Sequence, residues 1–260
     1  MKTAPLERAH ALATRYAELP DVVAVALSGS QTAGVADEAS DLDLYVYARQ
    51  EPDLDARRRL AGPNAEIGNR FFEPGDEWRE PDGVGIDVMF RDPAWIEGQL
   101  ERVLVRHEAS VGYSTCFWHN VATSVPIVDA TGWLAGLRRI CDVDYPEPLR
   151  AAIVARNHPL LRRNQSSFLH QLERASARGD RVAANHRAGA FLASFFDVLF
   201  ALNRLPHPGE KRLVAIAEAR CPKRPPGLDE TIAAFLSGGA GRAGDLIDAL
   251  DELLAADGLL

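Results

Sequence analysis

Two aspartates stand inside an apolar run near the N-terminus, where residues 41–48 read DLDLYVYA. Strand interiors disfavour aspartate, and successive side chains alternate between the faces of a strand, so Asp41 and Asp43 point to one side. Two ionised carboxylates about 4 Å apart repel by ~4 kcal/mol at an effective dielectric constant of 20. Either one is protonated or a cation lies between them. The pair predicts a divalent-metal site, and hard oxygen ligands suit Mg²⁺.

A third carboxylate, Asp87, occurs in the same setting, in the run VGIDVMF at 84–90. Its apolar neighbours take one face of the predicted strand, which leaves Asp87 on the other. We therefore expect Asp41, Asp43 and Asp87 to form the metal site, with Asp87 also able to accept a proton from an attacking hydroxyl. The alternative is that all three are ordinary charges on a solvated strand face.

The stretch Ser28-Gly29-Ser30 follows the short apolar run VVAVAL at 22–27. A glycine at the end of a strand lets the backbone approach a ligand closely, and the amides of such a turn can receive phosphate oxygens. Ser30 can add its hydroxyl. Gly-Ser turns are common, so the order of the features carries the argument: strand, Gly-Ser, ten residues, two aspartates on a strand, then a third aspartate.

The elements that position these residues are predicted from periodicity and breakers. Helices are expected at 4–19, 52–62, 93–107 and from 131, and strands at 22–27, 41–48, 66–72, 84–90 and 125–130, with a polar loop at 73–83. From Pro148 onward the patterns are helical: 148–178 with a kink at Pro159, a central buried helix at about 183–205, and shorter helices at 209–220, 228–237 and 242–256. The sequence thus predicts an α+β protein, with a mixed sheet and flanking helices at 1–146 and a helical bundle domain at 147–260.

Composition narrows the class of protein. The chain has 260 residues, a formal net charge of −8 and three widely spaced cysteines, Cys116, Cys141 and Cys221. The net charge disfavours a nucleic-acid partner, and the odd cysteine number favours reduced thiols. Neither a signal-peptide pattern nor an apolar run of about 20 residues is present, so we expect a cytoplasmic protein with no membrane partner.

The pattern resembles that of the polymerase-β-type nucleotidyltransferases. It is carried by Leu27-Gly29-Ser30, Asp41-Leu42-Asp43 and Ile86-Asp87-Val88. The α/β part followed by a helical part resembles the small-molecule branch, which includes antibiotic adenylyltransferases acting on aminoglycosides and lincosamides. The resemblance implies Mg²⁺, ATP as co-substrate, and transfer of a nucleoside monophosphate to a hydroxyl with release of pyrophosphate. It implies metal binding by the three aspartates and phosphate binding by Ser28, Gly29 and Ser30, with the helical domain completing the substrate and nucleotide sites.

Three weaker features and two alternative functions accompany this interpretation. Lys211, early in a predicted helix, is a candidate phosphate ligand, although exposed lysines are common. The loop 73–82 holds five acids against Arg79 and would attract a cationic acceptor such as an amino sugar. Glu66 is read as an ordinary strand-end charge.

The alternative functions are nucleotidylation of a protein or tRNA by a toxin-like relative, and nucleotide binding by a module without catalysis. The acceptor, the nucleotide and the oligomeric state are left open.

Overall fold

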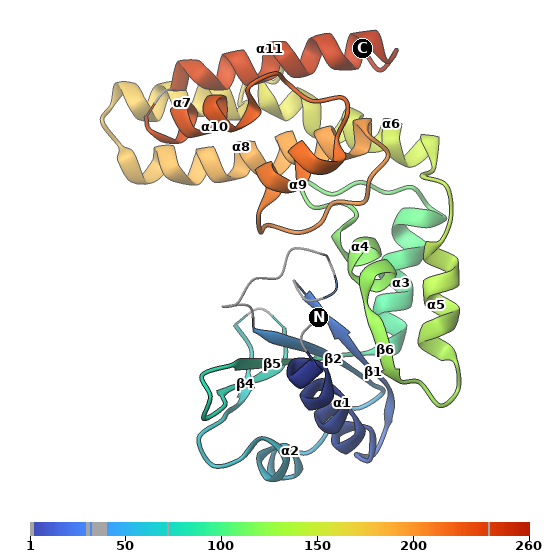
Figure 1. The fold of residues 1–260 in the computed structure, drawn as a ribbon. Helices are drawn as coiled ribbons and strands as arrows, with labels where there is room; N and C mark the ends of the chain where they lie inside the picture. The colour runs from blue at the N-terminus through green and yellow to red at the C-terminus, as the bar shows by residue number, and fades with distance from the viewer. Residues whose placement is uncertain (1–2, 30–31, 33–40, 72, 239) are drawn as a thin grey trace. The chain divides into compact units, whose positions relative to one another are not determined.

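The computed structural model describes residues 3–29, 32, 41–71, 73–238 and 240–260. Internal contacts divide the chain into two units: unit 1 comprises Met1–Glu101 and Phe117–Val143, and unit 2 comprises Arg102–Cys116 and Asp144–Leu260. The predicted α+β architecture is confirmed, since unit 1 contains a mixed sheet with flanking helices and unit 2 is helical (Figure 1). The segment 102–116 belongs to the helical unit although it precedes residue 146.

The sheet of unit 1 has the strand order β3-β4-β5-β2-β1-β6 within the described residues. The bounds are β1 (Val22–Ser28), β2 (Leu42–Ala48), β3 (Glu66–Asn69), β4 (Gly75–Arg79), β5 (Gly85–Arg91) and β6 (Val125–Val128). Strands β2 and β5 are parallel, whereas the other neighbouring strands are antiparallel. The sheet is therefore mixed, and its one parallel pair lies at the centre.

One face of the sheet packs against helix α1 (Thr3–Ala17), which matches the helix predicted at 4–19. The buried side of α1 meets the apolar side of the central strands, and the shared core includes Leu12, Tyr16, Leu44, Val46 and Val88. Because strand side chains alternate, the residues between these apolar positions must point to the opposite face. The aspartates of β2 and β5 occupy such positions.

Four further helices contribute to unit 1: α2 (Leu54–Ala61), α3 (Pro93–Leu104), α4 (Cys116–Thr123) and α5 (Trp133–Cys141). The sequence predicts α2, α3 and α5, and misses α4. Asp53 begins α2 by accepting hydrogen bonds from the amides of Asp55 (3.0 Å) and Ala56 (3.1 Å), an ordinary N-cap.

The predicted loop at 73–83 is wrong in its central part, because residues 75–79 form strand β4. Acids, prolines and a glycine disfavour a strand in isolation. The tertiary structure compensates: the fully buried Asp76 forms an ion pair with the fully buried Arg57 and accepts a hydrogen bond from the Gly68 amide (2.9 Å). A partner from another element thus stabilises a strand that its own composition disfavours.

Unit 2 is built from α6 (Glu147–Leu161), α7 (Phe168–Ala177), α8 (Arg181–Leu202), α9 (Leu213–Arg220), α10 (Leu228–Leu236) and α11 (Ala240–Ala256). As predicted, α8 is central, and its C-terminal half from Ser194 to Leu202 is buried. Helices α6 and α7 both pack on it, and α11 packs on α7 and α10. None of the described helices combines the length and the apolar character needed to cross a membrane.

The predicted helix 148–178 is two helices, not one kinked helix. Pro159 lies in the last turn of α6, which ends at Leu161. Ser167 then begins α7 by accepting a hydrogen bond from the amide of His170 (3.4 Å). A proline removes a helical hydrogen bond and a serine favours a new N-cap, so together they separate the helices.

Candidate functional site

The parallel pairing of β2 with β5 places Asp43 directly opposite Asp87. Side chains of directly paired residues emerge on the same side of a sheet, and neighbouring strands lie about 5 Å apart. Both aspartates are half-buried, and both are on the face opposite α1. Two of the three predicted carboxylates are therefore direct neighbours, although 44 positions separate them in the chain.

Ser28 and Gly29 lie on the other side of Asp43. Ser28 is paired with Asp43 across β1 and β2 and is 1% exposed. Gly29 has φ +66°, and a methyl group placed on it would overlap the Asp43 carboxylate. A glycine is therefore required here for two reasons, the left-handed backbone and the close approach of a carboxylate. Ser30 lies outside the described residues.

Asp41 stands just before β2 and is exposed. Its carboxylate lies over Gly85, the first residue of β5, where an added methyl group would overlap it. Asp41 and Asp43 are two residues apart, and so are Gly85 and Asp87 in the neighbouring strand. Asp41 therefore flanks the Asp43–Asp87 pair at the end of the strands.

The line of carboxylates continues across two further strands. Glu77 of β4 is paired with Asp87, and Glu66 of β3 is paired with Glu77. We call Asp43, Asp87, Glu77 and Glu66 the carboxylate row. Both glutamates are exposed, and Glu77 accepts a hydrogen bond from the Asn69 side chain (3.1 Å). Sequence reasoning missed Glu77 because it did not recognise β4, and it read Glu66 as an unrelated strand-end charge.

The five acids of 73–82 do not act together as a free acidic loop. Glu73 forms an ion pair with Arg91, Asp82 pairs with Arg8, and Glu80 accepts a hydrogen bond from the Trp78 indole (2.7 Å). Asp76 is paired with Arg57 as described above. Glu77 alone among these five belongs to the carboxylate row, so any attraction of a cation by this segment depends mainly on that residue.

The donor set of the row suits a hard divalent cation bound together with a phosphate. Among the described residues, histidine, cysteine, aspartate and glutamate side chains form no group of three or more that could hold a metal. Mg²⁺ in nucleotide sites is bound by one or two carboxylates, with phosphate oxygens and water as its remaining ligands. Asp43 and Asp87 fit that role as a pair of adjacent oxygen donors. They do not provide a complete all-protein cage.

Lys211 lies in unit 2, is exposed, and precedes α9, which begins at Leu213 and not at 209 as predicted. His158, read from the sequence as a surface or interdomain residue, is instead 3% exposed and forms a hydrogen bond with Asp251 of α11. Trp118 and His119 are both buried in α4. Of these residues, Trp118 and His119 belong to unit 1, as the row does, and Lys211 and His158 belong to unit 2.

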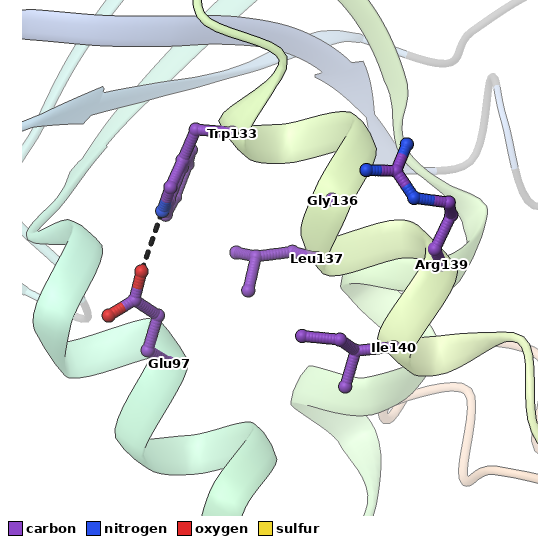
Figure 2. Close-up of a pocket in the computed structure, with 6 residues that line it drawn as sticks. All are labelled: Glu97, Trp133, Gly136, Leu137, Arg139 and Ile140. Carbon is purple, nitrogen blue, oxygen red and sulfur yellow. Dashed lines mark hydrogen bonds between the residues drawn. The ribbon is translucent and has the colours of Figure 1, made fainter.

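An open hollow in unit 1 is separate from the row. It lies between α3 and α5, has a volume of 510 Å³, and is lined by Glu97, Trp133, Gly136, Leu137, Arg139 and Ile140 (Figure 2). The Trp133 indole points toward Glu97 and donates a hydrogen bond to its carboxylate (2.6 Å). This hollow is wide open and holds no residue of the predicted site, so the chemistry of the carboxylates, and not cavity size, identifies the candidate site.

Comparisons with known proteins add two similarities. Residues 118–212 match the family model described as "Domain of unknown function (DUF4037)". The structure is similar to a crystal structure of a nucleotidyltransferase-like protein from Exiguobacterium sibiricum 255-15, with a TM-score of 0.45, 16% sequence identity, and coverage of 96% of this chain and 75% of that chain. No curated protein sequence matches the chain significantly.

Proposed function

We propose that this protein is a Mg²⁺-dependent nucleotidyltransferase that transfers a nucleoside monophosphate, AMP from ATP, to a hydroxyl of a small molecule and releases pyrophosphate. The observation that carries the proposal is the direct pairing of Asp43 with Asp87, next to the Ser28–Gly29 end of β1. The resemblance of the sequence motif to polymerase-β-type nucleotidyltransferases agrees with it.

In the proposed reaction, the acceptor hydroxyl oxygen attacks the α-phosphorus of the nucleotide. The bond from that phosphorus to the oxygen bridging the β-phosphate breaks, and pyrophosphate leaves with the bridging oxygen. Asp41, Asp43 and Asp87 would bind the cation, and the hydroxyl proton passes to the carboxylate of Asp87. When bound, Mg²⁺ would neutralise phosphate charge and orient the two reacting oxygens.

The phosphates are proposed to bind beside Gly29, where the Thr32 amide and hydroxyl both donate to the Gly29 carbonyl (3.2 Å each). Ser28 and Ser30 are proposed to contribute there as well, and Lys211 remains a candidate phosphate ligand from unit 2. Backbone amides at the end of a strand can donate hydrogen bonds to phosphate oxygens without adding charge. Positioning of this kind supplies much of the catalysis of a displacement at phosphorus.

The acceptor is proposed to carry amino groups, as an aminoglycoside- or lincosamide-like antibiotic does. Unit 1 has 22 acidic and 12 basic residues, and the outer end of the carboxylate row, Glu77 and Glu66, is exposed. Such a surface attracts a cation and repels a polyanion such as tRNA. A cationic acceptor bound along the row would lie one or two strand spacings, about 5–10 Å, from Asp87.

The test is metal-dependent pyrophosphate release from ATP with a panel of acceptors: aminoglycosides, lincosamides, neutral polyols, tRNA and unfolded protein. The expected result is pyrophosphate release with an amino-sugar acceptor, loss of release when EDTA is added, and an acceptor whose mass increases by one adenylyl group. Modification of protein or tRNA in place of the small molecules would favour the toxin-like alternative. Nucleotide binding without turnover across the whole panel would favour a non-catalytic module and refute the proposal.

Replacement of Gly29 by alanine is expected to abolish most of this activity while leaving the protein folded. The added methyl group displaces the Asp43 carboxylate, and the left-handed backbone costs roughly 1–2 kcal/mol with a side chain. Gly83→Ala is the matched control, because Gly83 also has positive φ (+89°) but has nothing within 4 Å of an added methyl group. The melting temperature should decrease by a similar amount in both variants, and only Gly29→Ala should lose turnover. Equal turnover in the two variants would contradict the role given to Gly29.

A further inference from the structure

Arg91 is a buried charge on the face of the sheet that carries the carboxylate row. It ends β5, four residues after Asp87, so the two side chains emerge on the same face. Arg91 is 4% exposed. Unlike Arg57, which stacks on Phe90 on the α1 side of the sheet, it has no place in the apolar core described above.

The guanidinium of Arg91 is held on three sides. It donates to both carboxylate oxygens of Glu73 (2.6 and 2.7 Å) and to the side-chain oxygen of Asn120 in α4 (3.4 Å). It also lies 3.7 Å from the centre of the Tyr45 ring, whose hydroxyl donates to the same Asn120 oxygen (3.2 Å). Burial alone would lower the pKa of Arg91, but Tyr45 and Glu73 raise it above its ordinary value, so the charge persists at every accessible pH.

Stability does not explain this arrangement well. Buried ion pairs recover little more than their desolvation cost, and an apolar side chain of similar length often replaces them without loss. Among the described residues, the Nη1 atom of Arg91 has no hydrogen-bond partner, which adds to the cost. Glu73 is 24% exposed at its side chain, so solvent screens its charge more than that of the guanidinium. The guanidinium end of the pair is the end that lies over Tyr45 of β2.

The position of Tyr45 shows how near this charge is to the row. Tyr45 lies two residues after Asp43 on the same face of β2, and two residues of a strand span about 7 Å. The guanidinium is stacked on Tyr45, and Arg91 is paired with Tyr47 one step further along, so the charge lies roughly 7–10 Å from the carboxylate row. This is within the Debye length of about 10 Å at 0.1 M ionic strength, and protein rather than water fills the space around the guanidinium.

We propose that Arg91 is a fixed countercharge for the carboxylate row, which weakens its binding of a bare divalent cation and favours the negatively charged nucleotide. Arg91 acts without touching either ligand, so it is a positioning residue and not a catalytic one. The inference rests on the proposed function, because it assigns cation and nucleotide binding to the row. It predicts opposite changes in the two affinities, whereas a residue that only supports the fold would weaken both.

The experiment measures Mn²⁺ binding by electron paramagnetic resonance and metal-free ATP binding by calorimetry in EDTA, on the full chain. Arg91→Met should bind Mn²⁺ about three- to tenfold more tightly and ATP weaker by a similar factor, as expected for one charge roughly 7–10 Å away in partly screened surroundings. Glu73→Gln should weaken Mn²⁺ binding. The double variant Arg91→Met/Glu73→Gln, with no net change in charge, should return both affinities to within about twofold of the parent.

Arg91→Lys keeps the charge and serves as the conservative control, with both affinities expected near those of the parent. A thermal melt of each variant excludes unfolding, and Glu73→Gln alone still tests the idea if Arg91→Met does not fold. If the affinities for Mn²⁺ and ATP both decrease, or if neither changes on these substitutions, the proposal that Arg91 is a countercharge is wrong. If the parent binds Mn²⁺ no better than Asp43→Asn does, the proposed function fails, and this inference with it.

Discussion

Substitution of Asp43 by asparagine is expected to reduce the rate of nucleotidyl transfer by roughly two to three orders of magnitude in a protein that remains folded, as is typical when a group that stabilises transition-state charge is removed. Asparagine keeps the shape and one oxygen but removes the negative charge next to Asp87. Asp87→Asn should do the same. The measurement is single-turnover formation of adenylylated acceptor at saturating ATP and Mg²⁺.

Thermal melting without metal separates the loss of activity from the loss of structure. Two ionised carboxylates about 5 Å apart repel by ~3 kcal/mol at an effective dielectric constant of 20, so removing either charge removes this repulsion. Asp43→Asn and Asp87→Asn should therefore melt at or above the temperature of the parent. A variant that kept near-parental turnover would remove the metal-site interpretation.

Glu66→Gln is the matched control for these variants. It removes the same unit of charge from the same carboxylate row, but two strands away from Asp87. Its rate at saturating acceptor should stay within about threefold of the parent, because screening weakens a charge effect over about 10 Å. If Glu66→Gln lowered the rate as much as Asp43→Asn, the effect would reflect the total charge of the row and not metal binding by Asp43.

The spacing of apolar residues was sufficient to predict much of the fold, because this spacing differs between a helix and a strand and can be read within each element. The alternation of β2 puts Leu42 and Leu44 into the core, as expected, and the apolar circumference of α8 corresponds to its buried C-terminal half. The errors occurred where tertiary partners outweigh local preference. Strand β4 depends on Arg57 from α2 to neutralise Asp76, and no pattern within 73–83 contains that information.

In the candidate site, too, the sequence indicates the residue types, whereas the register between strands depends on the tertiary structure. The sequence is enough to single out Asp41, Asp43 and Asp87 as unusual residues in strands. It does not reveal that β2 and β5 pair in parallel, which is what sets Asp43 opposite Asp87. For the same reason it could not bring Arg91 over Tyr45, since that contact joins strands that are distant in the chain. It could not place Glu77 in the row because β4 was not recognised as a strand. A missed strand therefore concealed one of the four carboxylates.

A second large effect is expected in unit 2, where stability should decrease as the pH rises from about 4 to about 7. Asp197 of α8 is 1% exposed, and burial raises its pKa from 3.8 to about 6 although Ser114 and Asn157 donate hydrogen bonds to it. A carboxyl whose pKa is raised in the folded state stabilises the fold below its unfolded pKa. That contribution is lost as the pH rises through the folded value, and two pKa units correspond to roughly 3 kcal/mol.

The hydrogen bonds of Asp197 show why this residue matters to the unit. Its carboxylate accepts from the Ser114 amide (3.0 Å) and hydroxyl (2.6 Å) and from the Asn157 side chain (3.0 Å). Asn157 in turn accepts from the Gly112 amide (2.9 Å) and donates to the Ser110 carbonyl (2.9 Å). These bonds attach the segment 110–114, which has no helix or strand of its own, to α6 and α8.

Asp197 is the group that titrates between pH 4 and 7 among the charged and ionisable groups acting on it. Arg102 acts on it from α3 and lowers the pKa of Asp197, against the larger opposite effect of burial. Tyr113 and Tyr145 also interact with it, and burial raises the pKa of both hydroxyls further above neutrality. The pH dependence is therefore assigned to the Asp197 carboxyl and not to its neighbours.

Denaturant unfolding followed at 222 nm, at pH 4.5 and at pH 7.5, tests this assignment. Asp197→Asn should be less stable than the parent at pH 4.5 by about 1–2 kcal/mol. Its amide NH2 group replaces one carboxyl oxygen and cannot accept a hydrogen bond, whereas Oδ2 of Asp197 accepts from Asn157 and Ser114. Between pH 4.5 and pH 7.5 its free energy of unfolding should decrease less than that of the parent, because the variant carries no buried charge at pH 7.5. Asp248→Asn, which removes an exposed acid of α11, should keep the parental pH dependence. If Asp197→Asn and Asp248→Asn show the same slope as the parent, Asp197 is ionised at both pH values, and its burial does not control the stability of the helical unit.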